Sequence, residues 1–155
     1  MKPVRGELER SGDESISAEE ARRLWSLAKG RIGSDSLGAY EQHAFDAGRN
    51  LAQNRATPAD VLHDMVVSRN KDGLQHTRSW FMDKIPLSEP LRSVVDHPNT
   101  SAETLYVIAA TGLDKRESEA AKKRLKEFRR GATLRQRIQL VAAKWRATRP
   151  EIPGK

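Results

Sequence analysis

The sequence contains no cysteine. A disulfide framework, a thiolate metal site and a cysteine nucleophile are therefore excluded. It also has no apolar run near the length of about 20 residues that a membrane-crossing helix needs, and its first residues lack the apolar core of a signal peptide. We therefore expect a cytoplasmic protein without a transmembrane segment.

Signatures of catalysis are also missing. There is no Gly-x-Ser-x-Gly motif and no glycine-rich loop after a strand. The histidines fall in different expected elements without metal-ligand spacing. These four residues are His43, His63, His76 and His97. We expect no metal, no cofactor and no catalytic residue, so the sequence predicts that the protein is not an enzyme.

No stretch alternates apolar and polar residues for long enough to indicate a strand, so the sequence predicts an all-α fold. A chain of 155 residues with 37% hydrophobic residues has enough apolar surface for one core. We expect a disordered lead over residues 1–15, one helical repeat domain over residues 16–149 and a disordered tail over residues 150–155. The lead is rich in charge and glycine and poor in apolar residues.

The chain repeats one phrase. The segment from Arg49 to Leu62 is echoed by the segment from Arg92 to Leu105, 43 residues later. Each copy begins with Arg, passes through a polar stretch to Thr, and closes with Ala, an acid and Leu. This spacing is typical of two-helix repeats that stack into solenoids. A third, half-length echo begins at Gly131.

Each copy has the features of a corner between two helices. Thr57 and Thr100 are placed to cap the next helix through their hydroxyls, and the acids three residues later complete a reciprocal capping box. We therefore interpret Asp60 and Glu103 as capping residues, not as a catalytic pair. His97, in the corner of the second copy, is expected to bond a backbone carbonyl.

The second copy resembles the leucine-rich repeat variant family, a group of α-helical repeats related to HEAT repeats. Its motif residues here are His97, Pro98, Asn99, Thr100, Glu103, Leu105, Ile108 and Ala109, preceded by Leu91, Arg92 and Val95. The resemblance implies an α-solenoid-like, right-handed stack of about eight short helices, with a protein partner bound along the stacked helices. The cysteine-ligated iron–sulfur segment of some members has no counterpart in this chain.

Apolar spacing and helix-end signals set the expected elements. We expect helices over about residues 18–30, 40–52, 58–69, 74–82, 91–95, 101–111, 114–130 and 133–149. Two of them begin with capping pairs, Ser17 with Glu20 and Thr133 with Gln136. In the first helix, Trp25 is expected to face inward.

Charge is concentrated near the carboxyl end. Residues 113–155 hold 14 Lys and Arg against 5 Asp and Glu, whereas the rest of the chain holds 14 against 16. On the expected helix over 114–130, most of these cations share the arc opposite the apolar residues. The candidate partner-binding or phosphate-binding residues are Lys115, Arg116, Lys122, Lys123, Lys126, Arg129, Arg130 and Arg135.

This basic face has several interpretations. It is typical of a solvated helix that keeps a protein soluble. It is also typical of a surface that neutralises phosphates of a nucleic acid, with weak sequence preference. An acidic protein partner or an anionic membrane is a third possibility. Because no RNA-binding aromatic motif or clear helix-turn-helix signature is present, any nucleic-acid contact should be mainly to phosphates. Nucleic-acid binding is our alternative hypothesis.

The last expected helix carries a narrow apolar stripe, Leu134, Ile138, Val141 and Trp145, with basic residues along both flanks. The simplest interpretation is a terminal helix that covers the open end of the core. A membrane or a partner's groove is the other interpretation, which requires Trp145 to be exposed. The sequence therefore predicts a non-enzymatic protein-binding module of unknown oligomeric state, with nucleic-acid binding as the alternative.

Overall fold

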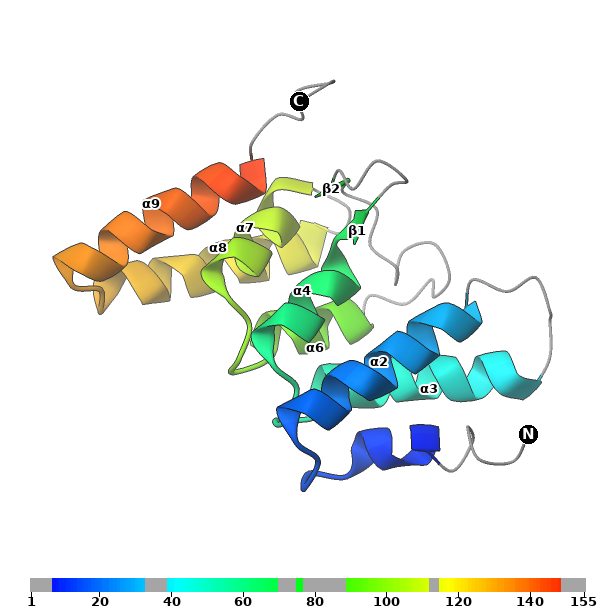
Figure 1. The fold of residues 1–155 in the computed structure, drawn as a ribbon. Helices are drawn as coiled ribbons and strands as arrows, with labels where there is room; N and C mark the ends of the chain where they lie inside the picture. The colour runs from blue at the N-terminus through cyan, green and yellow to red at the C-terminus, as the bar shows by residue number, and fades with distance from the viewer. Residues whose placement is uncertain (1–6, 33–38, 70–74, 77–88, 112–114, 149–155) are drawn as a thin grey trace. The chain divides into compact units, whose positions relative to one another are not determined.

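The computed structural model describes residues 7–32, 39–69, 75–76, 89–111 and 115–148. These residues are mostly helical, which confirms the predicted all-α class (Figure 1). The elements are η1 (Arg10–Gly12), α2 (Ala18–Ile32), α3 (Ala39–Gln53), α4 (Ala59–Val66), β1 (Ser68–Arg69), β2 (Gln75–His76), α6 (Glu89–Asp96), α7 (Ala102–Thr111), α8 (Lys115–Arg130) and α9 (Leu134–Thr148).

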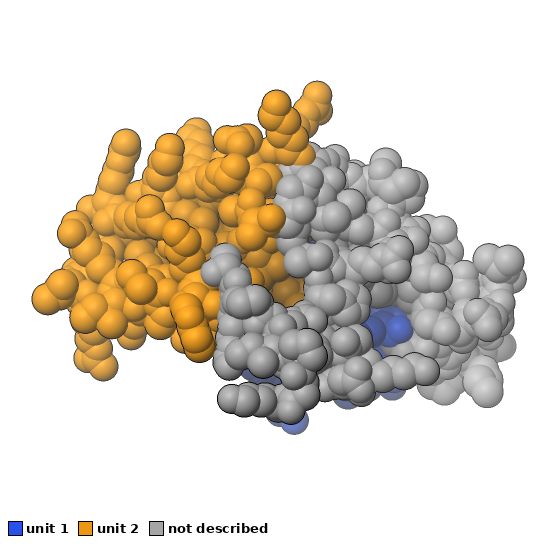
Figure 2. Space-filling model, turned by 90° about the horizontal axis from the view of Figure 1, so that it is seen from above, with its two compact units in different colours: residues 1–62, 97–99 blue, residues 63–96, 100–155 orange. Residues whose placement is uncertain are grey.

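The chain divides into two compact units (Figure 2). Unit 1 comprises residues 1–62 and 97–99, and unit 2 comprises residues 63–96 and 100–155. The division falls within α4, between Leu62 and His63.

In unit 1, α2 packs against α3 through the stripes that helical spacing predicted. Trp25 is 4% exposed, so the prediction that it faces inward is confirmed. The buried residues of the two helices are Ala21, Leu24, Trp25 and Ala28 of α2 and Ala44, Ala47, Leu51 and Ala52 of α3. The side chains of Tyr40 and Phe45 on α3 lie outside the described part.

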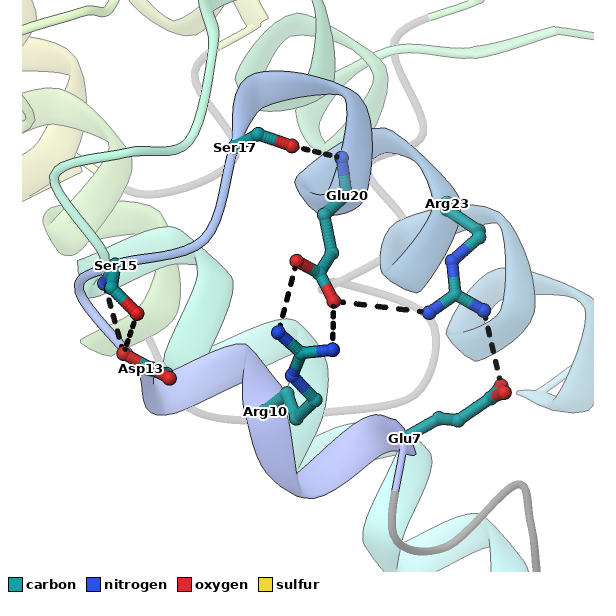
Figure 3. Close-up of polar contacts among 7 residues, drawn as sticks. All are labelled: Glu7, Arg10, Asp13, Ser15, Ser17, Glu20 and Arg23. Carbon is teal, nitrogen blue, oxygen red and sulfur yellow. Dashed lines mark hydrogen bonds and ion pairs between the residues drawn. The ribbon is translucent and has the colours of Figure 1, made fainter.

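The chain before α2 belongs to this core. Residues 7–9 form a helical turn that leads into η1, and η1 packs against α3 with Leu8 and Ser11 buried. Arg10 pairs with Glu20 of α2 at 2.7 Å, and Ser17 accepts a hydrogen bond from the backbone N–H of Glu20 at 3.1 Å (Figure 3). The predicted cap at Ser17 therefore forms, while the Glu20 carboxylate bonds Arg10. Residues 1–6 of the predicted disordered lead lie outside the described residues.

The corners of unit 1 share one local hydrogen bond. In each corner, a side chain accepts a hydrogen bond from the backbone N–H two residues later, as in an Asx turn. The pairs are Asp13 with Ser15 at 2.9 Å, Asn54 with Ala56 at 2.9 Å, and His97 with Asn99 at 3.0 Å. Within the described residues this turn therefore occurs in both copies of the repeat and once before them, at Asp13.

Each later corner is also bonded to the corner before it. Asn54 Nδ2 donates to the carbonyl of Asp13 at 2.9 Å, and His97 Nε2 donates to the carbonyl of Asn54 at 2.7 Å. Because His97 Nδ1 accepts from the N–H of Asn99, these contacts together define the neutral imidazole protonated at Nε2. The expected role of His97, bonding a backbone carbonyl, is confirmed.

Thr57 and Thr100 are equivalent, but they do not cap the next helix. Both are buried, and each hydroxyl donates to a carbonyl six residues earlier, at Leu51 and at Val94. Those carbonyls lie in the last turns of α3 and α6, where carbonyls run out of the N–H partners that a continuing helix would supply. The Leu51 carbonyl also accepts the backbone N–H of Asn54 at 3.2 Å. The predicted capping role is therefore wrong, and the hydroxyls instead complete the preceding helices.

The acids of the predicted capping boxes also have other partners. Asp60 pairs with Arg22 of α2 at 2.8 Å, and Glu103 pairs with Arg146 of α9 at 3.1 Å. At α7, Ser101 accepts a hydrogen bond from the N–H of Thr104 at 3.2 Å and so acts as the cap. Sequence spacing alone placed the cap one residue too early.

In unit 2, α7 is the central helix. It packs against both α8 and α9, and α6 packs against α8. Thr104 to Ile108 are five consecutive buried residues, so α7 is covered around its circumference. Residues 131–133 turn the chain between α8 and α9 (Figure 1).

One short segment differs from the predicted helices. The third helix was expected to reach residue 69, but α4 ends at Val66 and residues 68–69 pair antiparallel with residues 75–76. A turn-rich sequence between two short segments allows this local pairing. The remainder of the expected helix over 74–82 lies outside the described residues.

Candidate functional site

All eight cations that the sequence selected are exposed. Seven of them lie on α8, and Arg135 lies on α9. Lys122 pairs with Glu119 one turn earlier at 3.1 Å, and Arg129 donates to the hydroxyl of Tyr106 at 3.1 Å. The predicted basic face therefore exists on the solvent side of α8.

Part of this face surrounds a surface depression of about 450 Å³. The depression, which we call the basic groove, runs over Tyr106, Ala109 and Ala110 of α7. Its charged lining consists of Glu119, Lys122, Lys123, Lys126 and Arg129 of α8, together with Lys144 of α9. Five cations and one acid make it a site of positive potential. Lys115, Arg116, Arg130 and Arg135 do not line it.

Arg124 differs from the other α8 cations. It donates to the carbonyl of Val95, and its guanidinium lies 5.5 Å from the centre of the Phe128 ring. Burial lowers the pKa of Arg124 from its ordinary value. This arginine fastens α8 to the end of α6, so it is a packing residue within the basic helix.

The apolar stripe of α9 is exposed to solvent, which overturns the prediction that it covers the core. The exposed fractions are 77% for Leu134, 63% for Ile138, 70% for Val141 and 60% for Trp145. We call these four residues the α9 ridge. A shallow apolar groove lies along it, lined by Arg137, Ile138, Val141, Ala142 and Trp145. A contact with a membrane or with a partner's groove requires an exposed Trp145, and Trp145 is exposed.

The ridge is exposed because α9 packs through a different face. Ala143 is buried, Leu140 is half-buried, and Arg146 pairs with Glu103 at the start of α7. Ala143 and Leu140 are thus on the covered face of α9, while the four side chains of the ridge remain exposed. Thr133 and Gln136 form the predicted reciprocal cap, with bonds of 2.8 and 3.3 Å, so the start of α9 is fixed.

The third echo at Gly131 is not a third equivalent corner. Thr133 is exposed and its hydroxyl accepts a hydrogen bond from Gln136, whereas Thr57 and Thr100 are buried donors. A threonine hydroxyl accepts a hydrogen bond when it caps the start of a helix, and it donates one when it bonds a carbonyl at the end of the preceding helix. The sequence could not distinguish them.

No family model, curated protein or solved structure matches this chain.

Among the described residues, no three His, Asp or Glu side chains gather as a metal site would require. Across the same ranges, no helix is both long and apolar enough to cross a membrane. What unit 2 presents is an apolar ridge beside a cationic groove, with Lys144 lining the groove one residue before Trp145 of the ridge. Such surfaces bind partners by burial and by charge.

Proposed function

We propose that this chain is a non-enzymatic binding module whose partner is another protein, held on the α9 ridge. The observation that carries the proposal is the exposure of four large apolar side chains on one face of one helix. Exposed apolar residues scattered singly need no explanation, but a continuous line of them marks an interaction surface.

The repeated corners support the scaffold part of the proposal. Three similar turns, two of them bonded to the preceding corner, are what a stack of helical repeats requires. We therefore propose an α-solenoid-like scaffold of the leucine-rich repeat variant or HEAT-like kind. The ridge is then the surface of the last helix of that scaffold, in place of the line of stacked helices that the family resemblance implied.

Site-specific crosslinking tests the proposal. A photoreactive p-benzoylphenylalanine would replace Ile138 on the ridge and, as the control, exposed Glu19 on α2. We expect irradiation in cells to crosslink one partner from position 138 and not from position 19. The purified partner should bind the wild-type chain and not an Ile138→Gln variant. Absence of a ridge-dependent crosslink would overturn the proposal.

The basic groove supports a second candidate function, binding of nucleic acid through phosphate contacts. The specific observation is that five cations from α8 and α9 line one depression. Neutralising several phosphates releases counterions, so affinity should fall steeply with salt concentration. Retention of the protein on a random duplex at low and moderate ionic strength measures this slope.

The groove residues provide the matched variants. Replacing Lys122, Lys126 and Arg129 by Glu should abolish retention on the duplex, whereas replacing Lys115, Arg116 and Arg130, which do not line the groove, should weaken it less. Equal effects of the two triple variants would indicate diffuse charge attraction. If the wild-type protein is not retained at low salt, nucleic-acid binding is excluded.

A further inference from the structure

The spacing of the α9 ridge is that of a helix–helix seam. Leu134, Ile138, Val141 and Trp145 follow one another at intervals of four, three and four residues. This is the d, a, d, a order of a heptad repeat, in which apolar side chains of one helix pack between those of another. The ridge spans about 16 Å at 1.5 Å per residue, or three helical turns. It matches a partner helix of about 12 residues.

The flanks of this seam are basic. In the same heptad register, the e and g positions are Arg135, Arg137, Ala142 and Lys144, and α9 contains no Asp or Glu. Charges at e and g positions determine which helices pair, because they lie across from the flanks of the partner. A helix with acidic flanks would be attracted, and one with basic flanks would be repelled.

Two other occupants fit the ridge less well. A second copy of this chain would bring two flanks of the same sign together, because no e or g position of the ridge carries an acid. In an antiparallel pair, Arg137 of one copy would lie opposite Lys144 of the other, so like charges would meet. A membrane surface is best matched by a broad apolar face, whereas a stripe confined to a and d positions is the narrower seam of a helix pair. Only an acidic helix satisfies both the spacing and the charge.

We infer that the α9 ridge binds a single amphipathic helix of a partner protein, with apolar residues at heptad spacing and Asp or Glu along both flanks. This inference rests on the proposed function and names the chemistry of its partner. A contact of one helix with three turns of another belongs to the small, transient class of interfaces, so we expect a dissociation constant on the order of micromolar.

Designed peptides test the inference on the full-length protein. The first is a labelled three-heptad helix with Leu and Ile at the seam and Glu at every e and g position, whose like-charged flanks oppose self-pairing. The second is identical but has Lys at those positions. Fluorescence anisotropy should show that the Glu peptide binds at least tenfold more tightly than the Lys peptide. An Ile138→Gln/Val141→Gln variant should lose binding and keep the wild-type circular dichroism spectrum.

A charge-swapped protein provides the decisive control. Replacing Arg135, Arg137 and Lys144 by Glu should reverse the preference, so that the Lys peptide binds and the Glu peptide does not. Equal binding of both peptides to the wild-type chain, lost in the Ile138→Gln/Val141→Gln variant, would overturn the charge selection but leave the ridge as a protein-binding surface.

The remaining outcomes identify the other occupants. Ridge-dependent binding to vesicles of phosphatidylcholine and phosphatidylserine, with neither peptide bound, would replace the helix by a lipid surface. A dimer in sedimentation that the Ile138→Gln/Val141→Gln variant abolishes would replace it by a second copy. A ridge-dependent crosslinked partner that contacts position 138 without a helix would overturn the inference alone. No binding of any probe and no crosslink would overturn the proposed function as well.

Discussion

The corners and helix α9 depart from the usual distribution of residues in opposite directions. At the corners, polar side chains are buried: Thr57 is 0%, Thr100 3% and His97 3% exposed. On α9, large apolar side chains are exposed, and Ala143 is the one hydrophobic residue that is fully buried in the described helix. Both features need a specific explanation, because polar side chains usually lie at the surface and large apolar side chains usually lie in the core.

The two regions differ in whether contacts within the chain account for the unusual burial or exposure of their side chains. Each buried corner group has its partner within the chain, such as Asn54 O for His97 and Leu51 O for Thr57. The buried polar groups of the corners therefore need no partner from another molecule. The packing of α9 on α7 does not use the ridge, so the ridge is where a contact with another molecule has a physical reason to form.

The same substitution in the two environments should give the largest contrast. Leu105 of α7 is 0% exposed and Leu134 of the ridge is 77% exposed. We expect Leu105→Ala to lower the free energy of unfolding by about 2–5 kcal/mol, through lost burial and a cavity. Leu134→Ala should change it by less than about 0.5 kcal/mol. Denaturant unfolding followed by circular dichroism measures both. Similar losses in the two variants would contradict the exposure of the ridge.

His97 should have the next largest effect. His97→Ala leaves the carbonyl of Asn54 and the N–H of Asn99 without their bonds, at a cost of about 2–4 kcal/mol in unfolding free energy. The second corner shows how to rescue it, because Asn54 makes both kinds of bond with an amide. His97→Asn should therefore retain most of the stability in chemical denaturation. Equal losses for Ala and Asn would show that the corners are not equivalent.

A smaller effect is expected from the two buried hydroxyls. Thr57→Val and Thr100→Val keep the side-chain shape but remove the donors to Leu51 O and Val94 O. Each should lower the unfolding free energy by about 1–2 kcal/mol. Because the two sites are equivalent, the two losses measured by thermal denaturation should agree within about 0.5 kcal/mol. A loss of stability at only one site would contradict the equivalence of the two corners.

The sequence predicted the helices well where the apolar face of a helix packs against the core of the protein. Spacing alone placed Trp25 inward, and this side chain is buried. The same rule failed for α9, since a stripe at helical spacing shows that one face is apolar but not what covers it. The charge count supplied a hint, because basic residues on both flanks of the stripe favour a partner outside the core.

Corner chemistry was only partly predictable. The repeat identified Thr57 and Thr100 as equivalent, and a Thr at a helix boundary is a familiar cap. Whether its hydroxyl donates backward or accepts forward depends on which carbonyl lies nearby, which requires coordinates. The first corner was missed, although Asp13 two residues before Ser15 repeats the pattern of Asn54 before Ala56. In the sequence, Asp13 was therefore the residue that indicated a turn at this position.

The smallest effect concerns the exposed side of the second corner. Arg22 donates two hydrogen bonds to Asp60, at 2.8 and 3.0 Å, and these hold the pKa of that carboxyl below its ordinary value of 3.8. A lowered folded-state pKa stabilises the fold above the unfolded pKa, and the contribution is lost as the pH falls through the folded value. Both side chains are more than half exposed, so Asp60→Asn should cost less than about 1 kcal/mol at pH 7. The difference between the variant and the wild type should shrink as the pH falls through the folded-state pKa of Asp60. Carboxyl NMR titration checks the cause: in an Arg22→Gln variant the Asp60 midpoint should return toward its ordinary value, and an unmoved midpoint would contradict the pairing.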